Sequence, residues 1–286
     1  MKTVHGSVVA LSIVLLGALS AGAAEPKPAP TPAKKQSSKP PAPPPIAPEA
    51  VAAVDRMGAY LKTLATYSVH VDTATDEVLE AGPKVQFGGT MDIDVRSPNG
   101  FHLTWSGDRQ KGAEYFYDGS SVTVYGRDQN VWASVPAPLG LEKMLDEIRG
   151  KYEIDLPLDD LVRGAQSGTL LDDVKAGILV GTGRVAGVEC DHVGFHSDGY
   201  DWQLWIEKGD RPLPRKLVIT TLTEPSQPQH SEVITWNLTP KLEDATFKFV
   251  APKDAERIVI AEKKAAAPST KKAAAKKAPA KTEVKK

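Results

Sequence analysis

The sequence predicts an α+β domain, in which one long, curved antiparallel sheet of about ten or eleven strands carries about three helices against its concave face. Two observations predict this class. Most segments from residue 67 onward alternate apolar and polar residues, as strands with one buried face do. Three other stretches place apolar residues three and four apart, which is the spacing of one helix face.

The first expected element is a helix over residues 51–64. Pro48 suits a first helical turn, and Glu49 complements the positive end of the helix dipole. Five apolar residues then recur at helical spacing, so that one stripe faces a core: Val51, Val54, Met57, Leu61 and Leu64.

Six strands are expected to follow, each with its apolar residues on one face and the other face wet. Between two of them, Asp118 and Gly119 form a dipeptide that is a strong hairpin signal. The expected strands cover residues 67–71, 85–95, 101–105, 115–117, 122–125 and 132–135.

Two short helices are expected to interrupt the sheet. Residues 141–148 have apolar side chains at helical spacing, and residues 158–162 form a shorter set after Pro157. Their apolar faces need a surface to cover, and the surface available is the apolar face of the sheet.

The second half of the sheet is expected to centre on a meander over residues 187–219. Its three strands are separated by gaps too short for crossover helices, so they must be antiparallel. The strands expected in this half cover residues 178–180, 188–195, 201–207, 215–219, 232–238 and 247–250.

The two ends of the chain differ from this central domain, residues 48–261. Residues 1–24 have a charged start, an apolar run of about a dozen residues and small residues near Ala23, which predicts a secretory signal peptide. An uncleaved membrane anchor is the alternative. Residues 25–47 are a Pro/Ala/Lys-rich linker, and residues 262–286 form a basic tail expected to be disordered.

The formal charge of −1 hides this asymmetry, because the tail holds nine lysines against two glutamates while residues 49–261 carry −12. The signal peptide predicts export to the periplasm. Cys190 is the single cysteine, so the chain can form no internal disulfide and must be stabilised by its core.

Three patterns that could carry chemistry have simpler interpretations. Residues 181–187 nearly match a dinucleotide fingerprint, but a strand follows where a helix is needed, so a hairpin turn is favoured. Cys190, His192 and His196 could share a metal, whereas a buried thiol and a hydrogen-bonded histidine are the simpler expectation. No catalytic motif is present, so we expect a non-enzyme with no cofactor or metal.

The aromatic residues point to a binding role. Trp202 and Trp205 are three residues apart in one strand and must therefore face opposite sides of the sheet. An apolar sheet under three short helices leaves room for a hydrophobic ligand. The residues expected to line such a cavity are Phe87, Met91, Ile93, Trp105, Met144 and one or both of Trp202 and Trp205.

The meander also contains a recognisable sequence pattern: GVECDH at residues 187–192, DWQLWIE at 201–207 and GDRPLPRKL at 209–217, together with YDG at 117–119. Over residues 48–258 the chain resembles a domain-of-unknown-function family of predicted periplasmic proteins, which is similar to the lipoprotein-sorting proteins LolA and LolB. This resemblance implies an incomplete β-barrel with helices as a lid over a hydrophobic cavity. No ligand-binding residue of those proteins can be placed one to one in this sequence.

Together these observations predict an exported, non-catalytic carrier or binding protein for a lipid-like or acylated ligand. Its expected partners are lipid or lipoprotein acyl chains and, through the basic tail, an anionic envelope surface. Nucleic acid is not an expected partner of an exported protein, and no transmembrane span is expected after signal cleavage. The alternative is an envelope scaffold whose core is filled by its own side chains and whose tails make the contacts.

Overall fold

A computed structural model describes residues 46–80, 82–152, 154, 156 and 159–262 of the chain. The expected signal peptide, linker and basic tail lie outside the described residues, apart from residues 46, 47 and 262. Over the described ranges, no helix has the length and apolar character needed to span a membrane.

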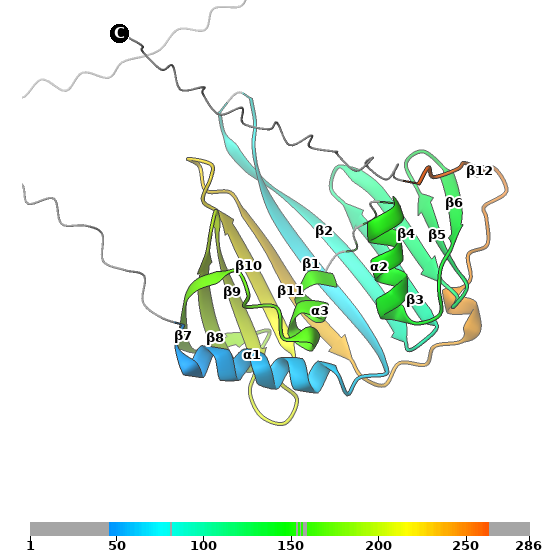
Figure 1. Ribbon diagram of the computed structural model, residues 1–286. Helices are drawn as coiled ribbons and strands as arrows, with labels where there is room; N and C mark the ends of the chain where they lie inside the picture. Colours follow the sequence, from blue (N-terminus) through cyan, green and yellow to red (C-terminus); the bar gives the residue numbers. More distant parts are fainter. Residues whose placement is uncertain (1–45, 81, 153, 155, 157–158, 263–286) are drawn as a thin grey trace, which may run out of the picture. The chain divides into compact units, whose positions relative to one another are not determined.

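The strands form one open sheet in the order β12-β6-β5-β4-β3-β2-β1-β11-β10-β9-β8-β7, which confirms the α+β class and the long sheet (Figure 1). All neighbours are antiparallel except β12 and β6. The strands are β1 (Thr66–Val78), β2 (Lys84–Arg96), β3 (Gly100–Gly107), β4 (Gln110–Tyr117), β5 (Ser121–Gly126), β6 (Val131–Pro136), β7 (Val174–Val185), β8 (Val188–Ser197), β9 (Tyr200–Glu207), β10 (Pro214–Thr221), β11 (Gln229–Asn237) and β12 (Glu256–Arg257).

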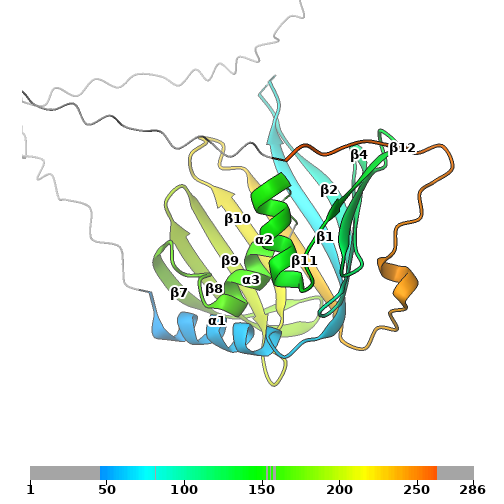
Figure 2. The same ribbon diagram turned by 45° about the vertical axis from the view of Figure 1, so that its right-hand side comes forward.

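Three α-helices cover the face that we call concave, and the opposite face is called convex. They are α1 (Pro48–Leu61), α2 (Leu141–Tyr152) and α3 (Asp159–Ser167). Figures 1 and 2 show the sheet curving around α2 and α3, with α1 along one end of the strands. The expected number and placement of helices are thus confirmed.

Helix α1 buries the apolar stripe that its sequence predicts, including Met57 and Leu61. It ends at Leu61 rather than at residue 64, because the chain turns there: the amide of Thr63 donates to the carbonyl of Tyr60 at 2.9 Å. The C-terminal end of α1 is held by α3, since the Gln166 side chain donates to the carbonyl of Leu61 at 3.1 Å.

Two apolar clusters fill the concave side. The larger cluster joins α1 and α3 to the middle strands and to β8 and β9, and includes Met57, Val71, Leu103 and Leu204. The smaller cluster joins α2 to β4, β5 and β6 through six buried residues: Tyr117, Val122, Val135, Met144, Ile148 and Leu156. The core is therefore divided into a part under α1 and α3 and a part under α2.

The expected hairpin turns are confirmed. The carboxylate of Asp118 accepts hydrogen bonds from the amides of Ser120 and Ser121, both at 2.9 Å, between β4 and β5. Between β7 and β8, Ala186 and Gly187 both have positive φ, as a tight two-residue hairpin turn requires. The glycine-rich run before β8 is thus a hairpin, as favoured over a nucleotide-binding loop.

Two expectations were wrong. Residues 247–250 do not form a strand, and the convex face of the sheet is not exposed to water throughout. A 3-10 helix, η1 (Asp244–Phe247), takes the first part, and Phe249 then packs on the convex side against Phe116, Tyr125 and Trp132. Phe247 and Phe249 therefore alternate in a segment that packs on the sheet without pairing with a strand. Strand β12 follows it and runs parallel to β6.

Candidate functional site

The concave face brings together most of the residues that the sequence singles out as a possible ligand site. The strand register sets Met91 opposite Val71 on β1 and Trp105 on β3. Ile93 is the next residue along β2 on the same face. Met91 and Ile93 are fully buried, and Trp105 packs against them half-buried.

The two central tryptophans face opposite sides, as their spacing requires. Trp202 is 6% exposed and stacks on Phe195, with ring centroids 4.3 Å apart, in the larger concave cluster. Trp205 stacks on His192 at 4.0 Å and lies under the ammonium group of Lys216. Because it belongs to the convex face, Trp205 is apart from the other six residues.

Phe87 and Met144 are the two remaining residues of the expected site, and they lie on different elements of the fold, β2 and α2. Phe87 lies half-buried near the β1–β2 hairpin, with the guanidinium of Arg109 4.8 Å from its ring centroid. Met144 is fully buried but belongs to α2 and to the smaller cluster. The expected lining residues are therefore distributed over both clusters.

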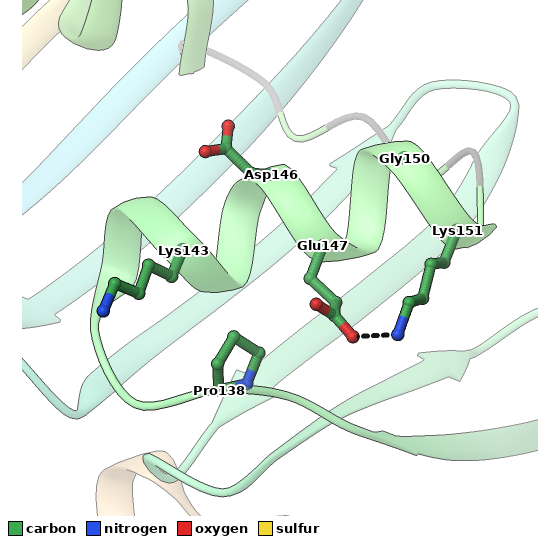
Figure 3. Close-up of a pocket in the computed structure, with 6 residues that line it drawn as sticks. All are labelled: Pro138, Lys143, Asp146, Glu147, Gly150 and Lys151. Carbon is green, nitrogen blue, oxygen red and sulfur yellow. Dashed lines mark hydrogen bonds and ion pairs between the residues drawn. The ribbon is translucent and has the colours of Figure 1, made fainter.

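Two hollows formed by the described residues lie elsewhere. One, of about 480 Å³, lies on the charged outer side of α2 and is lined by Pro138, Lys143, Asp146, Glu147, Gly150 and Lys151 (Figure 3). The other, of about 150 Å³, involves the convex polar residues Ser68, His70 and Asp92, and includes only Ile93 of the expected set. In this conformation the concave side is thus packed mainly by its own side chains.

A polar cluster interrupts the apolar concave face on β11. The His230 ring lies 2.7 Å from the hydroxyl of Thr75 through Nδ1 and 3.1 Å from Oε1 of Glu232 through Nε2. Glu232 is 6% exposed. The sequence interpretation missed this cluster, although Ile234 and Trp236 alternate inward on the same strand and so place Glu232 inward as well.

The residues considered for a metal site have other partners. Cys190 is buried, and this burial raises the pKa of its thiol. His192 hydrogen-bonds Gln203 at 3.0 Å and His196 hydrogen-bonds Asp201 at 2.6 Å. Within the described part of the chain, no group of three or more His, Cys, Asp or Glu residues is placed to hold a metal ion.

Comparison with known proteins gives one family. The family model described as "Predicted periplasmic protein (DUF2092)" matches residues 50–261. No curated protein matches the chain.

Several solved structures are similar at low identity. An uncharacterized conserved protein from Thermus thermophilus has 16% identity and a TM-score of 0.42, over 74% of this chain and 99% of that one. The lipoprotein LppX from Mycobacterium tuberculosis has 14% identity and a TM-score of 0.43, over 68% and 99%. A LolA superfamily protein from Nitrosomonas europaea has 10% identity and a TM-score of 0.29, over 70% and 97%.

Proposed function

Because the chain belongs to the DUF2092 family of predicted periplasmic proteins, we propose that it is a periplasmic, non-catalytic carrier or binding protein for a lipid-like or acylated ligand. Family membership confirms the resemblance seen in the sequence and the expected location in the periplasm. The ligand is proposed to lie between the concave face of the sheet and helix α2.

The observation that carries this proposal is how little of α2 is fixed to the sheet. Only Met144 and Ile148 of its twelve residues are fully buried, with Leu141, Leu145 and Tyr152 half-buried beside them, whereas α1 buries six of its fourteen. Away from the sheet α2 carries the charged residues Lys143, Asp146, Glu147 and Lys151 (Figure 3). A helix with only two fully buried side chains can act as a lid over the apolar face beneath it.

Magnitudes show what kind of ligand could open this lid. Burying a side chain such as Met144 or Ile148 contributes about 1.5–3 kcal/mol, so the two together contribute about 3–6 kcal/mol. An alkyl chain gains about 0.8 kcal/mol per buried methylene, or about 5 kcal/mol for six methylenes and about 8 kcal/mol for ten. Short chains therefore gain no more than the lid contacts provide, and only longer chains should bind well.

A titration with lysophospholipids whose acyl chains run from six to sixteen carbons, kept below their micelle concentrations, tests this proposal by tryptophan fluorescence. We expect no measurable binding at six carbons and increasing affinity beyond about ten. Met144→Asp should weaken binding, because it places a carboxylate against the acyl chain. Leu139→Asp, at a position 61% exposed, is the matched control and should bind like the wild type.

The position of the chain is tested with the two central tryptophans. An acyl chain brominated near its middle quenches tryptophans that it contacts. Trp202→Phe should remove much of this quenching, and Trp205→Phe, on the convex face, should leave it intact. Equal effects of both substitutions would place the lipid outside the concave face.

The envelope scaffold is the competing function, and one observation favours it. The concave residues of the described chain are packed against one another, and neither of the two hollows described above opens into the space between the sheet and its helices. A scaffold with a filled core would show no fluorescence response to any chain length.

A further inference from the structure

The proposed binding face contains one buried polar atom that an acyl chain does not explain. Oε1 of Glu232 is paired with His230 at 3.1 Å, but Oε2 is buried and meets no hydrogen-bond partner among the described residues. A buried carboxylate oxygen without a donor is destabilising. Its presence on this face calls for a donor that arrives from outside the chain.

The strand register shows where this oxygen lies in relation to the site. Glu232 is opposite Leu217 on β10, and His230 is opposite Ile219, which in turn pairs with Trp202. On the other side of β11, His230 is opposite Thr75, which pairs with Phe87. The polar cluster therefore lies between two aromatic residues of the proposed ligand site, one on each side.

Hydrogen bonds fix the side chains so that one carboxylate oxygen is left without a donor. When Nε2–H of His230 donates to Oε1 of Glu232, Nδ1 accepts from the Thr75 hydroxyl at 2.7 Å. Of the two carboxylate oxygens of Glu232, only Oε1 is thus held by a hydrogen bond. Its Oε2 retains the full capacity to accept a hydrogen bond.

Solvent reaches the His230 side of the cluster. The side chain of His230 is 35% exposed, while that of Glu232 is 8% exposed. His230 is the second residue of β11, and Thr75 lies close to the β1–β2 hairpin; both belong to the end of the sheet away from α1 (Figure 1). A polar group could reach Glu232 from this end while an attached chain extends toward the apolar core.

We propose that Oε2 of Glu232 accepts a hydrogen bond from the head group of the bound amphiphile, so that the protein selects ligands with a hydroxyl or ammonium donor beside an apolar chain. This inference rests on the proposed function and adds the chemistry of the ligand's polar end. His230 and Thr75 act as positioning residues, because they hold the carboxylate without needing to contact the ligand.

The test compares four probes with the same twelve-carbon chain by tryptophan fluorescence. Dodecylammonium and dodecanol carry donors, whereas dodecyltrimethylammonium and dodecyl methyl ether do not. We expect each donor probe to bind at least about tenfold more tightly than its donor-free counterpart, which is the typical effect of one hydrogen bond to a charged group. A preference confined to the ammonium pair identifies an amine as the head group, and one confined to the neutral pair identifies a hydroxyl.

A matched pair of variants separates this site from general charge effects. Glu232→Gln removes the charge from the buried carboxyl and should reduce the donor preference to a few-fold or less. Asp92→Asn makes the corresponding change at an exposed carboxylate, paired with His70 at 2.7 Å on the convex face, and should leave the preference unchanged. A preference that survives Glu232→Gln would overturn the assignment.

The outcomes also distinguish this inference from the function on which it rests. Equal affinity of the wild-type protein for all four probes would overturn the donor site but leave the carrier function standing. An ordered water that satisfies Oε2 would give this result. Failure to bind any of the probes would overturn the carrier function itself. Because the wild-type comparison needs no variant, the test holds even if Glu232→Gln does not fold.

Discussion

At the scale of single residues, Asp118 gives the clearest prediction on stability. Partial loss of hydration raises the pKa of its carboxyl group, but hydrogen bonds from Ser120 and Ser121 outweigh this and leave the pKa below its usual value of 3.8. A lowered folded-state pKa gives stability that is present above the unfolded pKa and is lost as the pH falls through the folded one. Since Asp118 is exposed, this contribution is at most about 1 kcal/mol.

The variant Asp118→Asn keeps an acceptor but removes the charge. Above about pH 5 we expect the free energy of unfolding of the wild type to exceed that of the variant by a constant amount. Below about pH 3.8 this difference should shrink. Urea unfolding at a series of pH values measures this. A difference that grows as the pH falls would contradict the assignment.

The sequence predicted which side of the sheet many of the singled-out residues face, and alternation explains why. Strict period two placed Met91 and Ile93 inward and separated Trp202 from Trp205. The same rule could have placed Glu232 on the concave face. It could not reveal the unpartnered Oε2, because that depends on side chains from β1 and β10, distant in the sequence.

At the scale of elements, the contact of α1 with α3 predicts that two glycines respond in opposite ways to alanine. A Cβ at Gly58 would lie 2.1 Å from the carbonyl oxygen of Ala165, whereas one at Gly150 in α2 would meet nothing within 4 Å. We expect Gly58→Ala to destabilise by about 1–3 kcal/mol through overpacking, despite the better helix propensity of alanine. Gly150→Ala should stabilise by up to about 1 kcal/mol.

Thermal unfolding of the two variants beside the wild type measures this difference. Gly150→Ala serves as the control, since both changes add the same methyl group to a helix. A Gly58→Ala protein as stable as Gly150→Ala would show that α1 and α3 do not pack closely.

Elements were predictable where one local pattern decides them. The expected strands that pair with sequence neighbours are present, and so are the three helices. The segment after β11 was mistaken for a strand, because Phe247 and Phe249 alternate as strand residues do. Their partners are Gly100 and the convex aromatic residues, and only the folded chain brings these together.

At the scale of the whole molecule, the contrast between an acidic domain and a basic tail predicts a second, weaker interaction. We expect the full chain to bind vesicles of anionic lipid, and truncation after Ala261 to abolish that binding, because nine lysines are removed. Binding should also be lost near ~0.5 M salt, where charges are screened beyond a few Å. Cosedimentation with anionic and neutral vesicles measures both effects.

The melting temperature of the truncated protein is the control. It should change little, because Glu262 is the one described residue that the truncation removes, and its contacts are an exposed 3.5 Å hydrogen bond from Tyr152 and an electrostatic interaction with the exposed Lys151. Vesicle binding that persists after truncation, or that persists at high salt, would contradict a role for the tail.

Native mass spectrometry of the protein, purified from its own envelope without detergent, shows whether the concave face carries a lipid-like ligand. We expect a mass above that of the polypeptide, an excess that disappears on organic extraction, and an extract containing an amphiphile with a long alkyl chain and a hydroxyl or amine head group. If every charge state has the mass of the bare polypeptide and the extract contains no lipid, the carrier function is contradicted.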